Sequence, residues 1–411
     1  MTVQSGQNFP IPGYVRQVLD TLERAGWEAW LVGGCVRDHL LGRPAKDYDV
    51  ATNAPPERVQ GLFPVVAPTG LAFGGVTVVL EGGRVEVTAF RSDRGYSDGR
   101  HPDAVAYGAT AREDAARRDF TIGALFWHPR RGLYDPTGQG LADLEAGVIR
   151  AVGSPRLRFQ EDALRILRAA RFAAQLGFSV EAETRAALGA CAPGLARVSR
   201  ERVTGELLKL LTTPYPQRLE LLGECGALDL LFDGRMLPHR RRDYTLAAKV
   251  PLSPGVRLAA FCLGTGLPLS VLKQSLRLPG ALAREAGDLL TLGLRRPSGD
   301  PLWLKARLAR YRPETVLSAL HLWQAAQGED LSGARRALVR ILAAGEPIRV
   351  AQLAVDGRDL LALGVLPQEI GGCLGALAML VLAYPRCNNR DFLLSQAGFI
   401  CQIGTGVGPT T

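Results

Sequence analysis

The spacing of apolar residues changes near residue 150 of this 411-residue chain. Before that point, short runs rich in β-branched residues are bounded by glycines, a pattern typical of strands. A helical pattern that starts near residue 14 leads into the first run, and the runs that predict strands are 29–32, 48–51, 75–80 and 84–90. The Glu-Gly-Gly-Arg segment at 81–84 predicts a hairpin turn between the last two strands.

After residues 152–155 the strand signals stop, and helical periodicity alternates with short breaks that contain glycine or proline. We therefore predict an α+β fold with a small mixed sheet in an N-terminal head, followed by helices alone. The predicted boundaries are 1–150 for the head, 151–212 for a neck, 213–330 for a body and 331–411 for a tail. The last residues, 404–411, are rich in glycine and threonine, and we expect them to be disordered.

The composition of the chain indicates what kind of partner and which cellular compartment to expect. The formal net charge of +9 fits a phosphate-rich partner, although charge alone is a weak indicator. The seven cysteines are scattered and form no Cys-x-x-Cys pair, which argues against a zinc site or a disulfide framework and favours a reducing cytoplasm. No signal peptide is predicted, and the longest apolar stretch, 373–384, is too short to cross a bilayer, so we expect no membrane association.

Candidate chemistry begins at Gly33-Gly34, which lets backbone N–H groups approach phosphate oxygens, with Arg37 adding positive charge in the next helical turn. Asp47 and Asp49 are one residue apart on a predicted strand, so their carboxylates share a face and could hold divalent metal ions. Glu86, on a neighbouring predicted strand, is a candidate third carboxylate. With Arg117-Arg118-Asp119 further along, these residues predict a nucleotide-polymerising site that uses Mg²⁺.

These motifs resemble the class II tRNA nucleotidyltransferases and poly(A) polymerases of the polymerase-β-like nucleotidyltransferase superfamily, over nearly the whole chain. The resemblance implies that segment 31–49 is the metal and triphosphate site. It implies ribose recognition for Arg117-Arg118-Asp119-Phe120-Thr121. Asp135-Pro136-Thr137-Gly138 resembles a third family motif, which acts in the coupling between head and neck.

A fourth matching motif contains Glu161, Asp162 and Arg165, which on a helix would project from one face. Cytosine and adenine each present an exocyclic amine beside a ring-nitrogen acceptor, whereas guanine and uracil present a carbonyl beside an N–H. A carboxylate next to a guanidinium would therefore accept C and A and reject G and U. The resemblance implies that Glu161 orients Arg165, and we assign Arg168 to the nucleotide site as well. From the residues alone, an ordinary i,i+4 surface ion pair remains the alternative.

The tail resembles the segment that in relatives holds the upper half of tRNA, with Arg358, Arg386 and Arg390 as candidate RNA contacts or as ordinary solvated side chains. Two positions depart from the family pattern: Gly123 stands where relatives usually have Asn, and His101 where Arg is common. The polar segment 96–102 keeps the full length of a loop that relatives use to switch from CTP to ATP. A product ending in A is thus favoured.

The sequence leaves several functions open. We favour a tRNA nucleotidyltransferase that adds CMP and AMP from CTP and ATP to build the tRNA 3′-terminal CCA. An enzyme that adds only the last A, after a separate enzyme has added the cytidines, would need the same residues. A poly(A) polymerase is less favoured because no Lys or Arg follows Arg390, and a non-catalytic RNA-binding protein is opposed by the intact Asp47 and Asp49.

Overall fold

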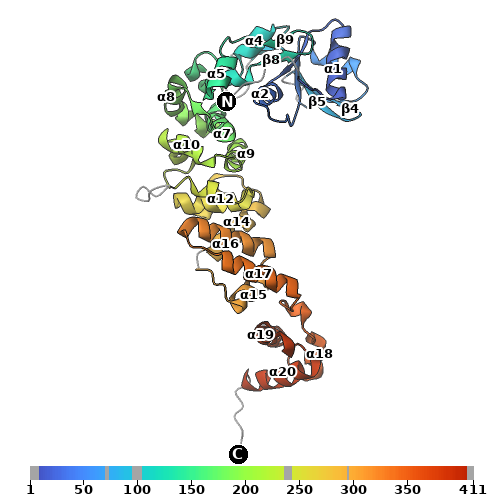
Figure 1. Ribbon diagram of the computed structural model, residues 1–411, viewed down its shortest axis with the longest axis vertical. Coiled ribbons are helices and arrows are strands. Elements are labelled where there is room, and N and C mark those ends of the chain that lie inside the picture. The colour runs from blue at the N-terminus through green and yellow to red at the C-terminus, as the bar shows by residue number, and fades with distance from the viewer. Residues whose placement is uncertain (1–8, 70–73, 95–103, 236–242, 294–295, 405–411) are drawn as a thin grey trace, which may run out of the picture. The chain divides into compact units, whose positions relative to one another are not determined.

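The computed structural model describes residues 9–69, 74–94, 104–235, 243–293 and 296–404 (Figure 1). Contacts divide the chain into two compact units. One comprises Met1–Arg240 with Ser270–Leu278, and the other Arg241–Leu269 with Pro279–Thr411. The first unit contains the sheet and every candidate residue for metal and nucleotide binding. The predicted boundaries between neck, body and tail stay predictions.

A seven-stranded mixed sheet forms the centre of the head, in the order β3-β4-β5-β2-β1-β8-β9. The strands are β1 Ala29–Val32, β2 Asp49–Thr52, β3 Val66–Ala67, β4 Gly75–Leu80, β5 Gly83–Ala89, β8 Phe126–His128 and β9 Gly132–Tyr134. The β2–β5 pair is parallel and the other pairs are antiparallel. The predicted hairpin is confirmed, since Leu80 pairs with Gly83 across a two-residue turn.

The strands form because their alternate side chains fill a shared core. Trp30, Val32, Ala51, Phe90 and Phe126 belong to one buried cluster on the sheet. Val32 pairs with Asp49 on one side and with Phe126 on the other. The end of β1, where the glycine pair begins, is thereby held beside the candidate carboxylates.

Short helices surround the sheet. They are α1 Gly13–Arg24, α2 Gly34–Leu40, α3 Pro56–Leu62, α4 Ala111–Ala116, η2 Thr121–Gly123 and α5 Gly140–Ala146. A separate two-stranded ribbon pairs β6 Arg91–Arg94 with β7 Ala104–Tyr107. Segment 96–102, His101 included, lies outside the described residues, as do residues 405–411 of the expected disordered terminus.

The described residues in the remainder of the first unit form helices and one short strand. Its helices are α6 Pro155–Glu161, α7 Leu164–Leu176, α8 Ala182–Cys191, η3 Ala192–Arg197, α9 Arg200–Leu211, η4 Pro216–Leu219, α10 Glu220–Glu224, α11 Ala227–Leu231 and α13 Leu269–Ser275. Strand β11, Ser179–Val180, pairs in parallel with β10, Val148–Ile149. This pairing adds a two-residue strand to a segment expected to be helical, and it ties the neck to the head.

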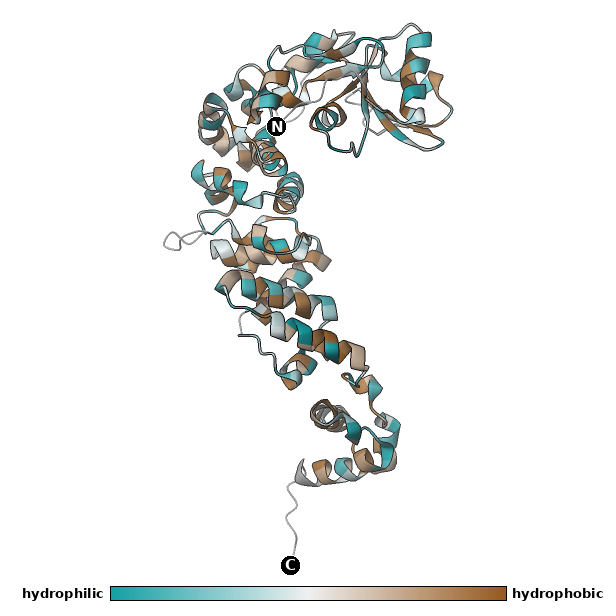
Figure 2. Ribbon diagram, viewed as in Figure 1, coloured by the Kyte–Doolittle hydropathy of each residue, from teal (hydrophilic) through white to brown (hydrophobic). Residues whose placement is uncertain are grey.

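The second unit is built from helices. They are η5 Leu246–Lys249, α12 Pro254–Thr265, α14 Gly280–Gly293, α15 Pro301–Leu308, α16 Pro313–Gln327, α17 Ser332–Ala344, η6 Val350–Gln352, α18 Gly357–Ala362, α19 Ile370–Ala383, η7 Pro385–Cys387 and α20 Arg390–Gly404. One apolar cluster joins α15, α16 and α17, and another joins α18, α19 and α20. Figure 2 shows that α19 is hydrophobic along most of its length.

Within the described part of the chain, no single helix is both long and apolar enough to cross a membrane. The bent pair α12 and α13 passes such a test on length and composition when the two helices are taken together. The residues of α12 are largely buried in the protein core.

Candidate active site

The glycine pair forms the turn between β1 and α2. Gly33 has φ +77°, a left-handed conformation that favours glycine, and it precedes the first residue of α2. A Cβ placed on Gly33 would lie 3.7 Å from Nη1 of Arg118 and 3.8 Å from Oδ2 of Asp49. Residues that are far apart in the sequence therefore meet at this turn, where a helix N-terminus leaves backbone N–H groups available for an anion.

The candidate carboxylates lie at the same end of the sheet. Asp49 pairs in register with Glu86 on the neighbouring parallel strand, and the Glu86 N–H donates to the carbonyl of Tyr48 at 3.3 Å. Burial, with further contributions from the nearby charges of Glu86 and Asp47, raises the pKa of Asp49 to about 6, although Arg118 opposes the shift. Asp47, which we expected on the strand, lies two residues before the start of β2 and is exposed.

This donor set fits a divalent metal ion. Asp49 is half-buried and lies close to the charges of Glu86 and Asp47, and a bound cation would relieve this concentration of negative charge. Among the described residues, no three His, Cys, Asp or Glu side chains gather into a metal cluster. Mg²⁺ is commonly held by one or two carboxylates together with substrate phosphates, so a pair of aspartates is sufficient when a triphosphate supplies the remaining oxygens.

Arg37 is buried and held in place by its neighbour. Its Nη2 lies 2.7 Å from Oδ1 of Asp38, and the guanidinium faces the ring of Phe172 with its carbon 5.3 Å from the ring centroid. A Cβ on Gly34 would lie 3.8 Å from the same Nη2. The positive charge expected beside the glycine turn is therefore present there.

Arg117 and Arg118 share a partner that the sequence analysis missed. Asp114 on α4 is fully buried, and its carboxylate accepts from Arg117 at 2.5 Å and from Arg118 at 2.8 Å. Arg118 also donates from Nη1 to the carbonyl of Gly123 at 3.4 Å. The spacings from Asp114 are i,i+3 and i,i+4, which could have indicated this pairing.

Asp119 and Arg168 form an ion pair between the head and α7, with Arg168 Nη2 2.6 Å from Asp119 Oδ2. Burial alone would raise the pKa of Asp119, but the charges of Arg168 and Arg165 hold it below its usual value. Gly123, where relatives usually have Asn, leaves room beside this pair: a Cβ there would lie 3.7 Å from Oδ1 of Asp119. The two residues, which were predicted separately for the nucleotide site, are thus in direct contact.

The fourth motif does not lie on one continuous helix, which corrects the sequence-based expectation. Helix α6 ends at Glu161, Asp162 has extended backbone with φ −151° and ψ 103°, and α7 begins at Leu164. The break arises because the Asp162 carboxylate turns back to accept the N–H of Leu164 at 3.0 Å.

Glu161 and Arg165 nevertheless meet across this break. Arg165 Nη1 donates to Glu161 Oε2 at 2.7 Å and to the carbonyl of Arg158 at 3.1 Å, and its Nη2 donates to the carbonyl of Arg117 at 3.2 Å. Arg158 also pairs with Glu161. The guanidinium of Arg165 is therefore fixed by partners from both the neck and the head.

Two further arginines, Arg202 and Arg171, lie near the residues of the fourth motif. Arg202 on α9 pairs with Asp162, with Nη2 2.7 Å from Oδ2, a contact that the sequence analysis did not predict. Arg171 follows Arg165 and Arg168 at intervals of three residues along α7 and pairs with Glu206 at 2.6 Å. The repeated spacing was the available signal for Arg171.

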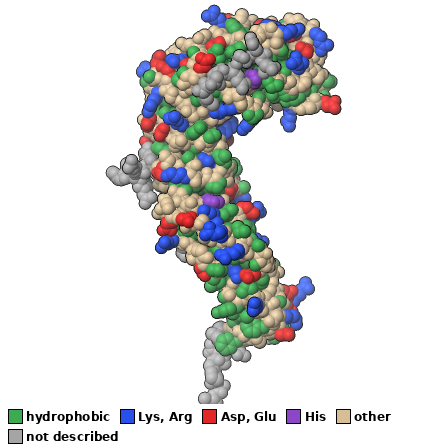
Figure 3. All heavy atoms as spheres, viewed as in Figure 1, with side chains coloured by type: hydrophobic (Ala, Val, Ile, Leu, Met, Phe, Trp, Pro, Cys, Tyr) green, Lys and Arg blue, Asp and Glu red, His purple; other side chains and the backbone are tan. Residues whose placement is uncertain are grey.

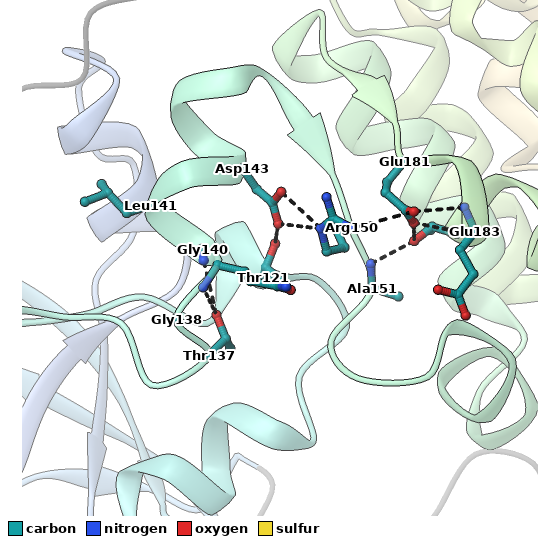
Figure 4. A network of polar contacts seen from close by, with 12 residues as sticks. Thr121, Thr137, Gly138, Gly140, Leu141, Asp143, Arg150, Ala151, Glu181 and Glu183 are labelled. Atoms are coloured by element: carbon teal, nitrogen blue, oxygen red, sulfur yellow. Dashed lines mark hydrogen bonds and ion pairs between the residues drawn. The ribbon is translucent and has the colours of Figure 1, made fainter.

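The third motif lies beside a polar network that runs from head to neck (Figure 4). Asp135 accepts the N–H groups of Thr137, Gly138 and Leu141, which closes the loop before α5. Thr121 donates to Asp143 at 2.7 Å, Asp143 accepts from Arg150 at 3.1 Å, and Arg150 lies 3.6 Å from Glu181 at the start of α8. The loop thus adjoins a chain of contacts from the second motif to the neck.

The candidate RNA contacts of the tail are all exposed. Arg390 at the start of α20 pairs with Asp359 of α18 at 2.5 Å, and Arg358 is the preceding residue of α18. Arg386 lies in η7. Figure 3 shows basic side chains distributed over the visible face of the second unit rather than gathered into one patch.

The sequence of this chain is similar to those of known nucleotide-adding enzymes. Residues 29–150 match the model of the poly A polymerase head domain, and residues 177–236 match a model described as a probable RNA and SrmB-binding site of polymerase A. The CCA-adding enzyme of Levilactobacillus brevis is 36% identical over 404 residues, covering 92% of this chain and 96% of that protein. That of Geobacillus sp. strain WCH70 is 37% identical over 351 residues, covering 84% and 85%.

Solved structures agree with the sequence matches. The crystal structure of the Bacillus stearothermophilus CCA-adding enzyme in complex with CTP aligns with a TM-score of 0.84 at 31% identity, covering 95% of this chain and 98% of that one. The Thermotoga maritima CCA-adding enzyme complexed with tRNA shares the fold, with a TM-score of 0.65 at 19% identity over 98% of this chain and 100% of that one. By fold, site geometry and relatedness over nearly its full length, the chain belongs to the CCA-adding enzymes, a family of tRNA nucleotidyltransferases.

Proposed function

We propose that this protein adds CMP and AMP from CTP and ATP to the 3′ end of tRNA, building or repairing the terminal CCA without a nucleic-acid template. Its membership of the CCA-adding family supports this reaction. The observation that carries it in this chain is the convergence of two sites in the first unit. Gly33, Asp49 and Arg118 meet at one, and Glu161, Asp162, Arg165 and Arg168 surround the other.

Nucleotidyltransferases of this family generally use divalent metal ions. We propose Mg²⁺ as the ion and Asp47 and Asp49 as its protein ligands, with Glu86 contributing negative charge beside them. When bound, the ion would supply charge neutralisation for the triphosphate and would lower the pKa of the attacking hydroxyl.

The phosphate-binding groups come from the chain itself. The backbone N–H of Gly34 and the guanidinium of Arg118 would receive the triphosphate, because they lie at the turn that adjoins Asp49. Gly33 shapes this turn, and its own N–H donates to the carbonyl of Leu125 at 3.3 Å. The 3′-hydroxyl of the RNA would attack the α-phosphorus in line and release pyrophosphate, a reaction in which positioning and charge stabilisation do most of the catalytic work.

Base selection is assigned to Asp162 and Arg165. The carboxylate of Asp162 would accept the exocyclic amine of cytosine or adenine, and Arg165 would donate to the neighbouring ring nitrogen. Guanine and uracil present a carbonyl to the carboxylate and are refused. Arg165 can perform this role because Glu161 and two backbone carbonyls hold its orientation before the nucleotide arrives.

tRNA is the proposed macromolecular partner, with Arg358, Arg386 and Arg390 contacting its phosphates. Because tRNA maturation takes place in the bacterial cytoplasm, we propose that compartment for the protein. Phosphate contacts release counterions, so binding should weaken steeply as salt is raised.

The decisive experiment uses three tRNA substrates, ending at the discriminator base, after one C and after two Cs, each supplied with CTP, ATP or both in the presence of Mg²⁺. Extension of all three to CCA is expected. Extension of only the two-C substrate, with ATP alone, would instead identify an A-adding enzyme that depends on a separate CC-adding enzyme. Equal addition of A to any RNA 3′ end would identify a poly(A) polymerase.

A further inference from the structure

Phe172 lies on α7, seven residues after the candidate base-selecting residue Arg165, and it is half-buried. Its ring meets that of Phe120 edge-on, with centroids 5.7 Å apart and an interplanar angle of 79°. Phe120 is buried in the head directly after Asp119. The ring of Phe172 is therefore anchored on one side by a residue of the second motif.

Three guanidinium groups face this one ring. Their central carbons lie 5.3 Å from the ring centroid for Arg37, 5.4 Å for Arg168 and 4.0 Å for Arg171. Arg37 comes from α2, directly after the glycine turn, whereas the other two come from α7. All three distances are within the range in which an aromatic ring attracts a cation.

Each of these arginines is also tethered to a carboxylate. The pairs are Arg37 with Asp38 at 2.7 Å, Arg168 with Asp119 at 2.6 Å and Arg171 with Glu206 at 2.6 Å. A carboxylate fixes a guanidinium in the plane of its N–H groups, and an aromatic ring restrains the perpendicular direction. Together the two contacts define the orientation of each planar group.

We infer that Phe172 is a positioning residue for nucleotide binding: its ring aims Arg37, Arg168 and Arg171 toward the phosphate and sugar groups of CTP and ATP. This inference rests on the proposed function and deepens it. Three like charges close together repel one another, and long side chains lose rotamer freedom when held. The ring opposes both effects before the nucleotide arrives and links the phosphate-binding turn to the base-selecting helix.

The test compares Phe172→Leu, which keeps an apolar side chain but removes the aromatic face, with Phe172→Tyr, which retains it. Phe172→Leu is expected to raise KM for both CTP and ATP by about tenfold, with a smaller change in kcat and an unchanged KM for tRNA. Phe172→Tyr is expected to stay within about twofold of the unaltered enzyme. Phe178→Leu is the matched control, because Phe178 is a buried neck residue that packs beside Gly147; it should lower stability and leave nucleotide KM unchanged.

Calorimetric binding of CTP and ATP with Mg²⁺ supplies a readout that does not require turnover. A Phe172→Leu protein that binds both nucleotides as tightly as the unaltered protein would overturn the inference, and so would a Phe178→Leu protein with the same rise in KM. Failure of the unaltered protein to extend tRNA would instead contradict the proposed function, whereas the calorimetric comparison would still decide the role of Phe172.

Discussion

Arg202 and Asp162 are 40 positions apart in the chain and form a two-point ion pair, with Nη2 to Oδ2 at 2.7 Å and Nη1 to Oδ1 at 3.3 Å. Oδ1 also accepts the N–H of Leu164 at 3.0 Å. A carboxylate oxygen has two lone pairs, so Oδ1 has both occupied while Oδ2 keeps one for an exocyclic amine. Arg202 thus fixes the orientation of Asp162, which is the condition that the proposed base selection requires.

Replacing Arg202 with Ala should therefore reduce the preference for C and A over G and U by about tenfold, within the range of ~1–3 kcal/mol associated with a good base contact. The measurement is the ratio of the kcat/KM value for CTP to those for GTP and UTP on a tRNA ending at the discriminator base, and of the value for ATP to those for GTP and UTP on a tRNA ending in CC. Arg185→Ala removes a comparable ion pair, with Glu224, at an exposed site and should leave the ratio unchanged. An Arg202→Ala enzyme with full selectivity would show that Asp162 needs no such support.

Replacing Asp49 with Asn removes the charge while keeping the shape of the side chain. Nucleotide addition should fall by more than about 100-fold, because losing several kcal/mol of charge stabilisation has an effect of at least this size. tRNA binding, measured by filter retention, should be unchanged. Asp20→Asn, on the exposed side of α1, is the control. Undiminished addition by Asp49→Asn would mean that the metal lies elsewhere.

The ion pair of Asp119 with Arg168 predicts a pH dependence of stability. The folded pKa of Asp119 is held below the value of ~3.9 expected for an unfolded chain. Its stabilising contribution is therefore complete above the unfolded value and is lost as the pH falls through the folded one. Asp119→Asn should lower the melting temperature at pH 7, and the difference from the unaltered protein should shrink below about pH 4. A difference that stays constant from pH 7 to pH 3.5 would contradict this origin.

Gly140, at the start of α5, leaves no room for a side chain. A Cβ there would lie 2.7 Å from the backbone carbonyl oxygen of Thr121 and 2.8 Å from Leu125. Gly140→Ala should destabilise the head by about 1–3 kcal/mol because the network that joins the second motif to the neck must shift. Thermal unfolding measures this, with Gly61→Ala in α3 as the control, since a Cβ at Gly61 meets nothing within 4 Å. Equal melting temperatures for the two variants would refute the packing argument.

Several elements of the candidate site could be predicted because each is encoded within a short, continuous segment of the sequence. The β-branched runs that became β2, β4 and β5 are long enough to show their periodicity, and the glycine turn follows directly from an apolar strand. Strand β8 spans only Phe126–His128, which is too short for any period to be recognised. Yet β8, which follows Gly123 in the chain, pairs with β1. It therefore lies beside the strand that ends at the glycine turn.

The break between α6 and α7 could not be predicted for a different reason. Residues 155–176 contain good helix formers on both sides of Asp162, so the local pattern favours one helix. The local turn at Leu164 and the ion pair with Arg202 override that preference. Sequence spacing cannot show which of many arginines will reach a given carboxylate from another helix.

The most direct test of the account compares unaltered protein with Arg165→Ala and Arg165→Lys. Each is given a tRNA ending in CC, one nucleoside triphosphate at a time, and Mg²⁺, with no other nucleic acid present. If protein side chains select the base, the unaltered enzyme will add A to this tRNA but neither G nor U. Both variants will lose this discrimination, since neither Ala nor Lys supplies a planar guanidinium. Retention of full selectivity by Arg165→Ala would contradict the claim that these side chains act as the template.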